Sequence, residues 1–237
     1  MMKIYQNYLF DLYGTLVDVH TDEENPLLWQ RMSIFLGMEG VHINAKALKE
    51  LYFTQVSARE TQAKLVIGHG AEIDIAPVFA SIYEEEGLCA DMSQIARAAH
   101  MFRIFSLEKL QIFPGTLQLL QKLKNEGKRV YLLSNAQALF TLPELRALDL
   151  EQYFDGIVIS SSEGIKKPDQ RLYKRILERY HLDPCQTVMV GNDDQADCWG
   201  AANAGLDSMY IFTEQSPTRT NPLPCNCRIL GRIEDVL

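Results

Sequence analysis

The chain has 237 residues, 47% of them hydrophobic, and a formal net charge of −8. This composition excludes wholesale disorder, and the negative charge argues against non-specific binding to nucleic acids. No apolar run approaches the roughly 20 residues of a membrane span, and the basic-then-apolar layout of a signal peptide is missing. We therefore expect a cytoplasmic protein with neither a membrane nor a nucleic acid as partner. Its five cysteines lack framework spacing, so we expect reduced thiols.

The first predicted element is a short buried strand, Tyr8 to Phe10, that ends at Asp11. In an open parallel sheet, ligands bind just outside the carboxyl ends of the strands. A carboxylate at that place can act as a nucleophile or as a ligand to a hard cation. Gly14 permits a sharp turn, and Thr15 offers a hydroxyl and a backbone N–H to an anion held above Asp11.

A long helical stretch is predicted directly after Val17. Apolar residues recur at helical spacing up to about Leu110, and the prolines at 26 and 77 fit the first turns of helices. This pattern predicts a helical cap domain over residues 18–110, inserted into a core domain formed by residues 1–17 and 111–237. A module inserted at this place could lie over the carboxyl edge of the sheet, where it would exclude water and select the substrate.

Strands alternate with helices in the rest of the chain. An amphipathic helix after Thr116 is expected to end at Gly127. Further strands are predicted over residues 129–133, 156–159, 187–190 and 208–212, with helices between them. The tail over residues 216–228 is rich in Pro, Asn and Cys and is predicted to be a loop. Alternation at this spacing indicates crossover units and a parallel sheet, which is an α/β architecture.

Polar residues follow three of the later predicted strands. They are Ser134-Asn135, Lys167 at the start of a helix, and Asn192-Asp193. Taken singly, such residues are typical of turns, helix N-caps and solvated charges. Because parallel strands end at the same edge of a sheet, we expect all of them to converge with Asp11 on one site.

These segments resemble the haloacid dehalogenase (HAD) superfamily of hydrolases. The resemblance rests on Phe10–Asp18, Leu133–Asn135, Lys166–Asp169 and Val190–Asp197, which follow one another in the order of the family's four motifs. The helical insertion after the first motif matches the subfamily with a helical cap there. The resemblance implies an α/β fold with a Rossmann-like parallel sheet core flanked by helices and an inserted all-helical cap domain.

The resemblance also implies roles for individual residues. Asp11 would attack a phosphorus, or a halogen-bearing carbon, and form a covalent aspartyl intermediate. Ser134 would hold a transferring phosphoryl oxygen, and Lys167 would neutralise charge on Asp11 and the substrate, in keeping with the demands of phosphoryl transfer. The substrate-binding residues implied are Gly14, Thr15 and Asn135.

A magnesium site is implied as well. Its ligands would be Asp11, the main-chain carbonyl of Tyr13, and the loop that carries Asn192 and Asp193; which of these two faces the ion stays open. Oxygen ligands of this kind are what Mg²⁺ prefers.

Two positions depart from the pattern of family phosphatases. Tyr13 stands where a catalytic general-acid aspartate is usual, and Asn192 stands where an aspartate ligand is common. A phenol with a pKa near 10 is a poor acid at neutral pH, and loss of a general acid typically costs about 10²–10⁴-fold in rate. Either the leaving group needs little protonation, as in an acyl phosphate, or the cap supplies an acid. Candidates for that acid are His42, His69 and Lys64.

Three functions are compatible with these residues. The leading interpretation is a Mg²⁺-dependent phosphatase acting on a small phosphorylated molecule. Tyr13 and Tyr173 are also similar to the pattern of the family's 2-haloacid dehalogenases, but the chain keeps the acidic residues Asp193, Asp194 and Asp197, and Arg31 and Arg59 do not match their cap arginine. The third alternative is a catalytically weak binding protein on the same fold. The sequence leaves the physiological substrate and the oligomeric state open.

Overall fold

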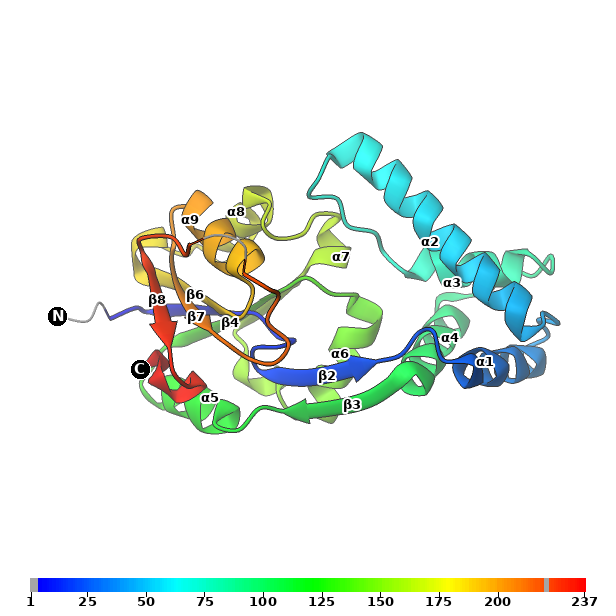
Figure 1. The fold of residues 1–237 in the computed structure, drawn as a ribbon, viewed down its shortest axis with the longest axis horizontal. Coiled ribbons are helices and arrows are strands. Elements are labelled where there is room, and N and C mark those ends of the chain that lie inside the picture. The colour runs from blue at the N-terminus through cyan, green and yellow to red at the C-terminus, as the bar shows by residue number, and fades with distance from the viewer. Residues whose placement is uncertain (1–3, 220–221) are drawn as a thin grey trace.

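The computed structural model describes residues 4–219 and 222–237 (Figure 1). It has an α/β fold in which helices flank a six-stranded parallel sheet, as predicted. Four further helices lie to one side of this sheet and are joined to it by a two-stranded ribbon (Figure 1). We refer to these helices, α1–α4, as the helical module. Among the described residues, no helix is both long and apolar enough to span a membrane.

The order of strands in the main sheet is β5-β4-β1-β6-β7-β8, and every neighbouring pair is parallel. The strands are β1 (Asn7–Phe10), β4 (Arg129–Ser134), β5 (Gly156–Ile159), β6 (Thr187–Gly191), β7 (Asp207–Ile211) and β8 (Cys227–Leu230). After β1 the chain builds β4 and β5 on one side, then returns to build β6, β7 and β8 on the other. The crevice at such a change of direction is where open α/β sheets bind ligands.

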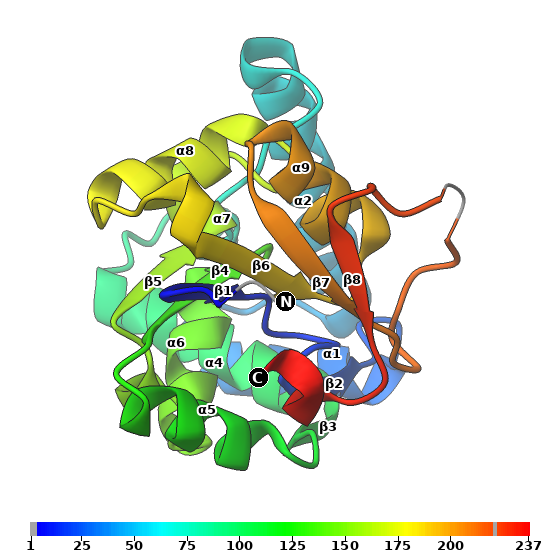
Figure 2. The same cartoon turned by 90° about the vertical axis from the view of Figure 1, so that its left-hand side faces the viewer.

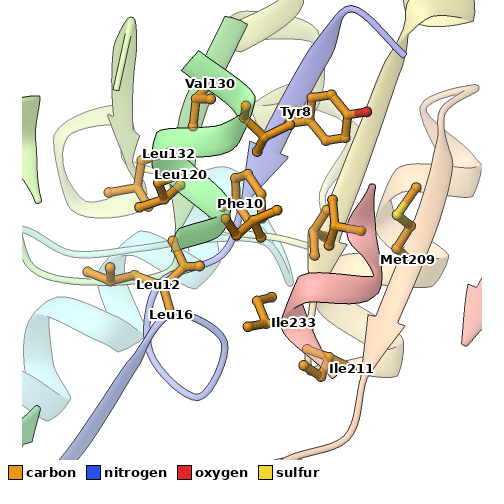
Figure 3. Packing of buried hydrophobic residues seen from close by; sticks show 14 of the residues in the cluster. Tyr8, Phe10, Leu12, Leu16, Leu120, Val130, Leu132, Met209, Ile211 and Ile233 are labelled. Carbon is orange, nitrogen blue, oxygen red and sulfur yellow. The ribbon is translucent and has the colours of Figure 1, made fainter. Parts of the chain in front are cut away.

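Side chains along the central strands point alternately to the two faces of the sheet, and both faces are buried. In β1, Tyr8 and Phe10 face one hydrophobic cluster while Leu9 faces another on the opposite side of the sheet. Figure 3 shows Phe10 packed near Leu12, Leu16 and other apolar side chains of the first cluster. Strands covered on both faces by helices are expected to be apolar throughout, and all of β1 is buried.

Helices cover both faces of the sheet (Figure 2). The first face carries α5 (Thr116–Asn125), α6 (Ala138–Ala147) and the short helix η4 (Ile233–Val236), whose apolar residues join the cluster around Phe10. The second face carries α8 (Gln170–Arg179) and α9 (Gly200–Asn203), which pack in the cluster around Leu9. Short connecting helices are α7 (Ser160–Glu163), η1 (Glu151–Tyr153), η2 (Pro184–Gln186) and the π-helix η3 (Asp194–Trp199).

The helical module has its own core. It comprises α1 (Pro26–Met38), α2 (Ala45–Ile67), α3 (Ala76–Glu84) and α4 (Met92–Ser106). Aromatic rings fill its centre, where Tyr52 and Phe102 stack with their centroids 4.8 Å apart. Phe140 of α6 joins this cluster from the sheet domain, with its ring 6.3 Å from that of Phe102. The module is therefore packed directly on α6.

Three local predictions need correction. The stretch from residue 18 to 110 contains the predicted helices, but its two ends form the antiparallel ribbon β2 (Val17–Thr21) with β3 (Leu107–Ile112). The tail predicted as a loop enters β8 at Cys227, and residues 220–221 of that tail lie outside the described residues. The helix predicted between the strands over residues 187–190 and 208–212 begins as the π-helix η3 and continues as α9. The ribbon and β8 are stabilised by pairing with distant segments, which no local pattern reveals.

Candidate active site

A cavity of about 180 Å³ lies outside the carboxyl ends of β1, β4 and β6. It is lined by Asp11, Tyr13, Ser134, Asn135, Lys167, Asn192, Asp193, Ala196, Asp197, Gln215 and Pro217. Gly14 and Thr15 lie in the turn beside it, where they approach Asn192. The structure therefore brings the residues predicted at the strand ends together at one edge of the sheet.

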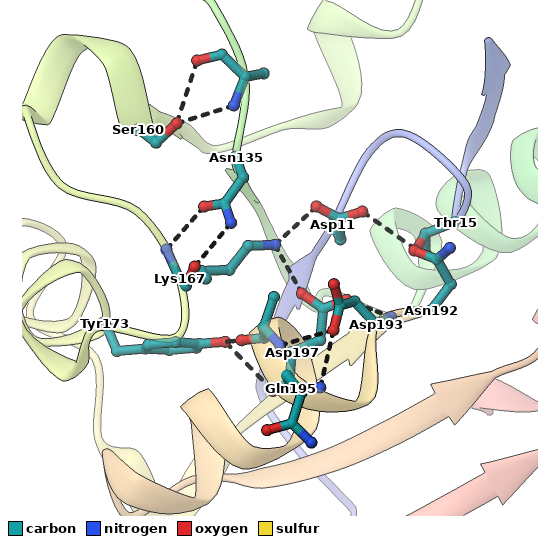
Figure 4. A network of polar contacts seen from close by, with 12 residues as sticks. Asp11, Thr15, Asn135, Ser160, Lys167, Tyr173, Asn192, Asp193, Gln195 and Asp197 are labelled. Atoms are coloured by element: carbon teal, nitrogen blue, oxygen red, sulfur yellow. Dashed lines mark hydrogen bonds and ion pairs between the residues drawn. The ribbon is translucent and has the colours of Figure 1, made fainter. Parts of the chain in front are cut away.

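The ammonium of Lys167 bridges two carboxylates in this cavity. Its Nζ lies 2.7 Å from Oδ1 of Asp11 and 2.7 Å from Oδ1 of Asp197 (Figure 4). Burial by itself would lower the pKa of Lys167, but the two carboxylates outweigh it and raise that pKa. Burial raises the pKa of Asp197, against the lowering effect of Lys167. Lys167 is thus held as a cation beside the more exposed Asp11, whose side chain is 11% exposed.

Contacts on two sides fix the loop that carries Lys167. The side-chain amide of Asn135 accepts the Lys167 N–H at 2.8 Å and donates to the Lys167 carbonyl at 2.9 Å (Figure 4). On the other side lies the linker between α2 and α3, which pairs Ala71 with Ile165 and accepts the Lys166 N–H at the carbonyl of Gly70. The amide of Asn135 therefore positions Lys167, and its predicted contact with substrate stays a prediction.

The hydroxyl of Ser134 is available for a ligand. Its Oγ is buried at the end of β4, in a residue that lines the cavity, and it has no hydrogen-bond partner among the described residues. Buried hydroxyls in proteins nearly always have a partner, and leaving one unpaired costs about 1–3 kcal/mol. A hydrogen-bonding group bound in the cavity would satisfy it.

Asn192 is linked to Asp11 through the hydroxyl of Thr15. Its Oδ1 accepts from Thr15 Oγ1 at 3.1 Å, and the same hydroxyl lies 3.4 Å from Oδ2 of Asp11 (Figure 4). Gly14 makes this approach possible, because a Cβ there would lie 2.3 Å from Nδ2 of Asn192 and the backbone has a φ of +80°. The turn after β1 and the loop after β6 are thus packed against each other through this glycine.

The acidic residues of the loop after β6 are partly engaged with the protein itself. Oδ1 of Asp193 accepts the N–H groups of Gln195 and Ala196 at the start of η3. Oδ2 of Asp197 accepts the Asp193 N–H at 3.0 Å while its other oxygen holds Lys167. π-Helical turns are frequent at functional sites, and this one aims Asp197 into the cavity lining.

The phenol of Tyr13 is bonded to a second polar cluster. Its hydroxyl donates to Oε2 of Glu144 at 2.5 Å and lies 3.1 Å from Oγ1 of Thr141, both on α6. Burial raises the pKa of Tyr13, and the negative charge of Glu144 raises it further. The proton of Tyr13 is therefore even less available for donation than that of a free phenol.

Arg103 of α4 completes this second cluster. Its Nε lies 2.5 Å from Oε1 of Glu144, and both side chains are largely buried. The guanidinium also lies 5.8 Å from the ring centroid of Tyr13 and 5.4 Å from that of Phe140. Arg103 thereby joins the helical module to the sheet domain. No local pattern indicates this role, because the partners of the Arg103 side chain lie 37 or more residues away from it in the chain.

Other candidates lie elsewhere. His42, His69 and Lys64 are exposed and do not belong to the described lining of the cavity. Tyr173 is fully buried, and its hydroxyl donates to the carbonyl of Ala196 at 2.6 Å, which supports η3 from below the cavity.

Sequence reasoning missed Gln215 and Pro217, which reach the cavity from the segment after β7. Gln215 also donates to Oδ1 of Asp18 on the ribbon at 2.7 Å. Their polar, proline-containing segment carries no motif, so only the fold brings them to the site.

Known proteins with similar sequences or folds include phosphatases and a dehalogenase. The chain is 31% identical over 127 residues to a glyceraldehyde 3-phosphate phosphatase of Methanothermobacter thermautotrophicus, a match that covers 54% of this chain and 56% of that one. The chain thus spans only about half the length of that relative.

Two solved structures share the fold over nearly the whole chain. A 2-haloacid dehalogenase of Pseudomonas syringae has a TM-score of 0.68 and 20% identity, with 98% of this chain and 96% of that one covered. The magnesium-bound HAD hydrolase YfnB of Bacillus subtilis has a TM-score of 0.59 and 21% identity, with 99% and 97% covered.

The sequence model of the haloacid dehalogenase-like hydrolases matches residues 5–205, which include all four candidate motifs and the helical module. The order of the strand ends and the geometry of the cavity agree with this match. The chain therefore belongs to the haloacid dehalogenase-like hydrolase family.

Proposed function

We propose that this protein is a phosphatase that acts on small phosphorylated molecules through an aspartyl phosphate on Asp11. The observation that carries the proposal is one cavity that combines a carboxylate, a cation and an unpaired hydroxyl. These groups are Asp11, Lys167 at 2.7 Å from it, and the buried Oγ of Ser134. The similarity to a phosphatase over half of the chain supports it.

The residues divide the reaction between them. A carboxylate oxygen of Asp11 attacks phosphorus, and the leaving oxygen of the substrate takes the bonding electrons. Lys167 offsets the negative charge of the phosphoryl group and of Asp11, and Ser134 donates its hydroxyl hydrogen to a phosphoryl oxygen. Water then cleaves the aspartyl phosphate and regenerates Asp11. Positioning and charge neutralisation of this kind are the main needs of phosphoryl transfer.

A Mg²⁺ ion fits the proposed site, with a small set of protein ligands. Lys167 engages Oδ1 of Asp11, whereas Oδ2 of Asp11 and Oδ1 of Asn192 both lie within hydrogen-bond distance of the Thr15 hydroxyl. Mg²⁺ is typically held by one or two carboxylates, with waters and substrate phosphate completing its shell. We propose Asp11 and Asn192 as ligands, with the Tyr13 carbonyl and Asp193 as further candidates. A bound Mg²⁺ would supply positive charge to the phosphoryl oxygens.

The substrate class follows from the engagement of Tyr13. Its phenol is bonded to Glu144 and its pKa is raised, so it is not a suitable acid for an alkoxide leaving group. We therefore propose substrates whose leaving group departs with little protonation, of which acyl phosphates are the leading class. The cavity has a volume of about 180 Å³. Pockets for drug-sized ligands typically have volumes of about 300–1,000 Å³, so the smaller cavity favours a small substrate.

A second candidate is hydrolysis of 2-haloacids, because a halide needs no protonation. The observation that favours it is Arg103, a cation that the helical module brings to Tyr13. Against it, Arg103 is paired with Glu144, and the acidic residues of η3 are retained. The phosphatase proposal therefore leads.

The test is release of p-nitrophenol from p-nitrophenyl phosphate, with and without Mg²⁺. This leaving group departs without an acid, so Tyr13 does not mask a working nucleophile. We expect Mg²⁺-dependent turnover that falls by at least about 10³-fold in Asp11→Asn and by about 10²-fold in Ser134→Ala. Ser208→Ala is the matched control, because its hydroxyl is also buried at a strand of the sheet but does not line the cavity.

The possible outcomes separate the candidates. Equal turnover in the natural protein and Asp11→Asn would exclude the proposed nucleophile. Absence of turnover, together with halide release from 2-haloacids, would establish the second candidate instead. Absence of both would leave the third interpretation, a binding protein on this fold.

A further inference from the structure

Two cysteines outside the cavity lining lie in direct contact. Sγ of Cys198 is 3.6 Å from Sγ of Cys227, although 29 residues separate them in the chain. Cys198 is fully buried and Cys227 is partly exposed, whereas Cys89, Cys185 and Cys225 are exposed. All five are free thiols in the structure.

The fold itself produces this contact. Cys198 belongs to the π-helix η3, which packs on β7, and Cys227 is the first residue of β8, where it lies opposite Ser208 of β7. β8 is the strand at the edge of the sheet, next to β7. The pair therefore joins the element that carries Asp197 to the outermost strand.

The contact makes the two thiols unequal. The interaction with Cys198 lowers the pKa of Cys227, and the same interaction, together with burial, raises the pKa of Cys198. The partly exposed Cys227 is thus the sulfur that ionises first. The thiolate is the form that attacks an oxidant, so the reactive sulfur belongs to the partly exposed cysteine.

We propose that Cys198 and Cys227 form an oxidation site at which hydrogen peroxide converts the two thiols into an intramolecular disulfide. The Cys227 thiolate attacks one peroxide oxygen, the O–O bond breaks, and the departing hydroxide takes a proton to become water. The sulfur of Cys198 then attacks the Cys227 sulfenic acid, the S–O bond breaks, and a second water leaves with the Cys198 proton. The two thiols lose two electrons, and the peroxide gains them.

Formation of the disulfide would affect the active site through Asp197, the residue next to Cys198. The two sulfurs must close from 3.6 Å to about 2.05 Å, a shift that rotation of the two side chains and movement of η3 or β8 would share. Cys198 follows Asp197, whose carboxylate holds Lys167 at 2.7 Å. Since misplacement of about 1 Å can cost 10²-fold in rate, we expect oxidation to lower turnover by about tenfold or more. This consequence rests on the proposed function, whereas the disulfide does not.

The experiment treats the full chain with hydrogen peroxide, blocks the remaining thiols with N-ethylmaleimide and maps the unreduced peptides by mass spectrometry. We expect a cross-link between the peptides of Cys198 and Cys227 that dithiothreitol reverses. Cys227→Ser and Cys198→Ala should abolish it, and the matched variant Cys185→Ser, which alters an exposed cysteine, should retain it. Cys227 is only partly buried, so its serine variant is expected to fold even if the other does not.

Two readouts keep the proposals distinguishable. Oxidised cysteines without the Cys198–Cys227 cross-link would overturn the oxidation site. Turnover of p-nitrophenyl phosphate should fall on oxidation of the natural protein and stay constant in Cys227→Ser. A protein that forms the cross-link but never hydrolyses the substrate would refute the proposed function and leave the oxidation site standing.

Discussion

Two buried ion-pair clusters differ in the parts of the chain that they join. The cluster around Lys167 lies within the sheet domain, between β1 and the loops after β5 and β6. The cluster around Arg103 lies between α4 of the helical module and α6 of the sheet domain. All the described residues that line the cavity come from the sheet domain and its connections, and none comes from α1–α4.

This difference suggests separate roles for the two parts of the chain: the sheet domain holds the proposed catalytic groups, and the helical module is the candidate for controlling access to them. The groups proposed for phosphoryl transfer are held by strand ends and need no side chain from the helical module. The module touches the site indirectly, through Arg103 at Tyr13 and through the linker that pairs with the loop before Lys167. We propose that the module acts as a cap whose position is set by these contacts, as lids in other enzymes govern access and water exclusion.

Removal of Lys167 should have the largest effect. In Lys167→Ala, Asp11 and Asp197 remain as close buried carboxylates without a cation, so we expect a loss of about 3–5 kcal/mol in the free energy of unfolding. Turnover should fall by about 10²–10³-fold, since charge neutralisation is lost. Urea titration and p-nitrophenyl phosphate hydrolysis measure the two effects.

Two further variants sharpen that result. Lys167→Ala combined with Asp197→Asn should recover part of the stability and none of the turnover, because it removes one of the two like charges. Lys166→Ala is the matched control, and a similar loss in it would show that the effect is not specific to the cavity.

Loss of the ion pair that joins the helical module to the sheet domain should lower the stability of the protein more than its turnover. Arg103→Met leaves Glu144 buried without its cation, so we expect a loss of about 2–4 kcal/mol in unfolding free energy. Turnover of p-nitrophenyl phosphate should change by less than about tenfold. Arg97→Met, on the same helix, is the control, because its pair with Glu39 is more exposed and is expected to contribute much less to stability. A loss of turnover as large as in Lys167→Ala would contradict the separation.

The smallest effect is expected for Tyr13→Phe. Loss of the hydrogen bond to Glu144 should cost about 1–2 kcal/mol, with little change in the pH profile of turnover between about pH 6 and pH 9. The folded-state pKa of Tyr13 is raised, so its stabilising effect is fully present below the unfolded value of about 10 and is lost as the pH rises beyond it. Urea midpoints should therefore fall more steeply above pH 10 in the natural protein than in the variant. Parallel curves would contradict the raised pKa.

The sequence by itself determined the sheet strands other than β8 and the set of residues at their ends. A short apolar run followed by Asp11, Ser134 or Asn192 is a local pattern, and parallel strands necessarily bring their carboxyl ends to one edge. The helices of the inserted stretch were equally visible, because amphipathic periodicity is also local. What these residues do chemically stays a proposal.

Only the tertiary structure decided the partners of those residues. Glu144 and Arg103 engage Tyr13, Gln215 reaches the cavity, and Cys198 meets Cys227, each across a long interval of sequence. The ribbon and β8 exist for the same reason, since their hydrogen bonds join segments that no local pattern connects. Side-chain pairing depends on how helices and strands pack, and packing is settled by the whole fold rather than by neighbours in the chain.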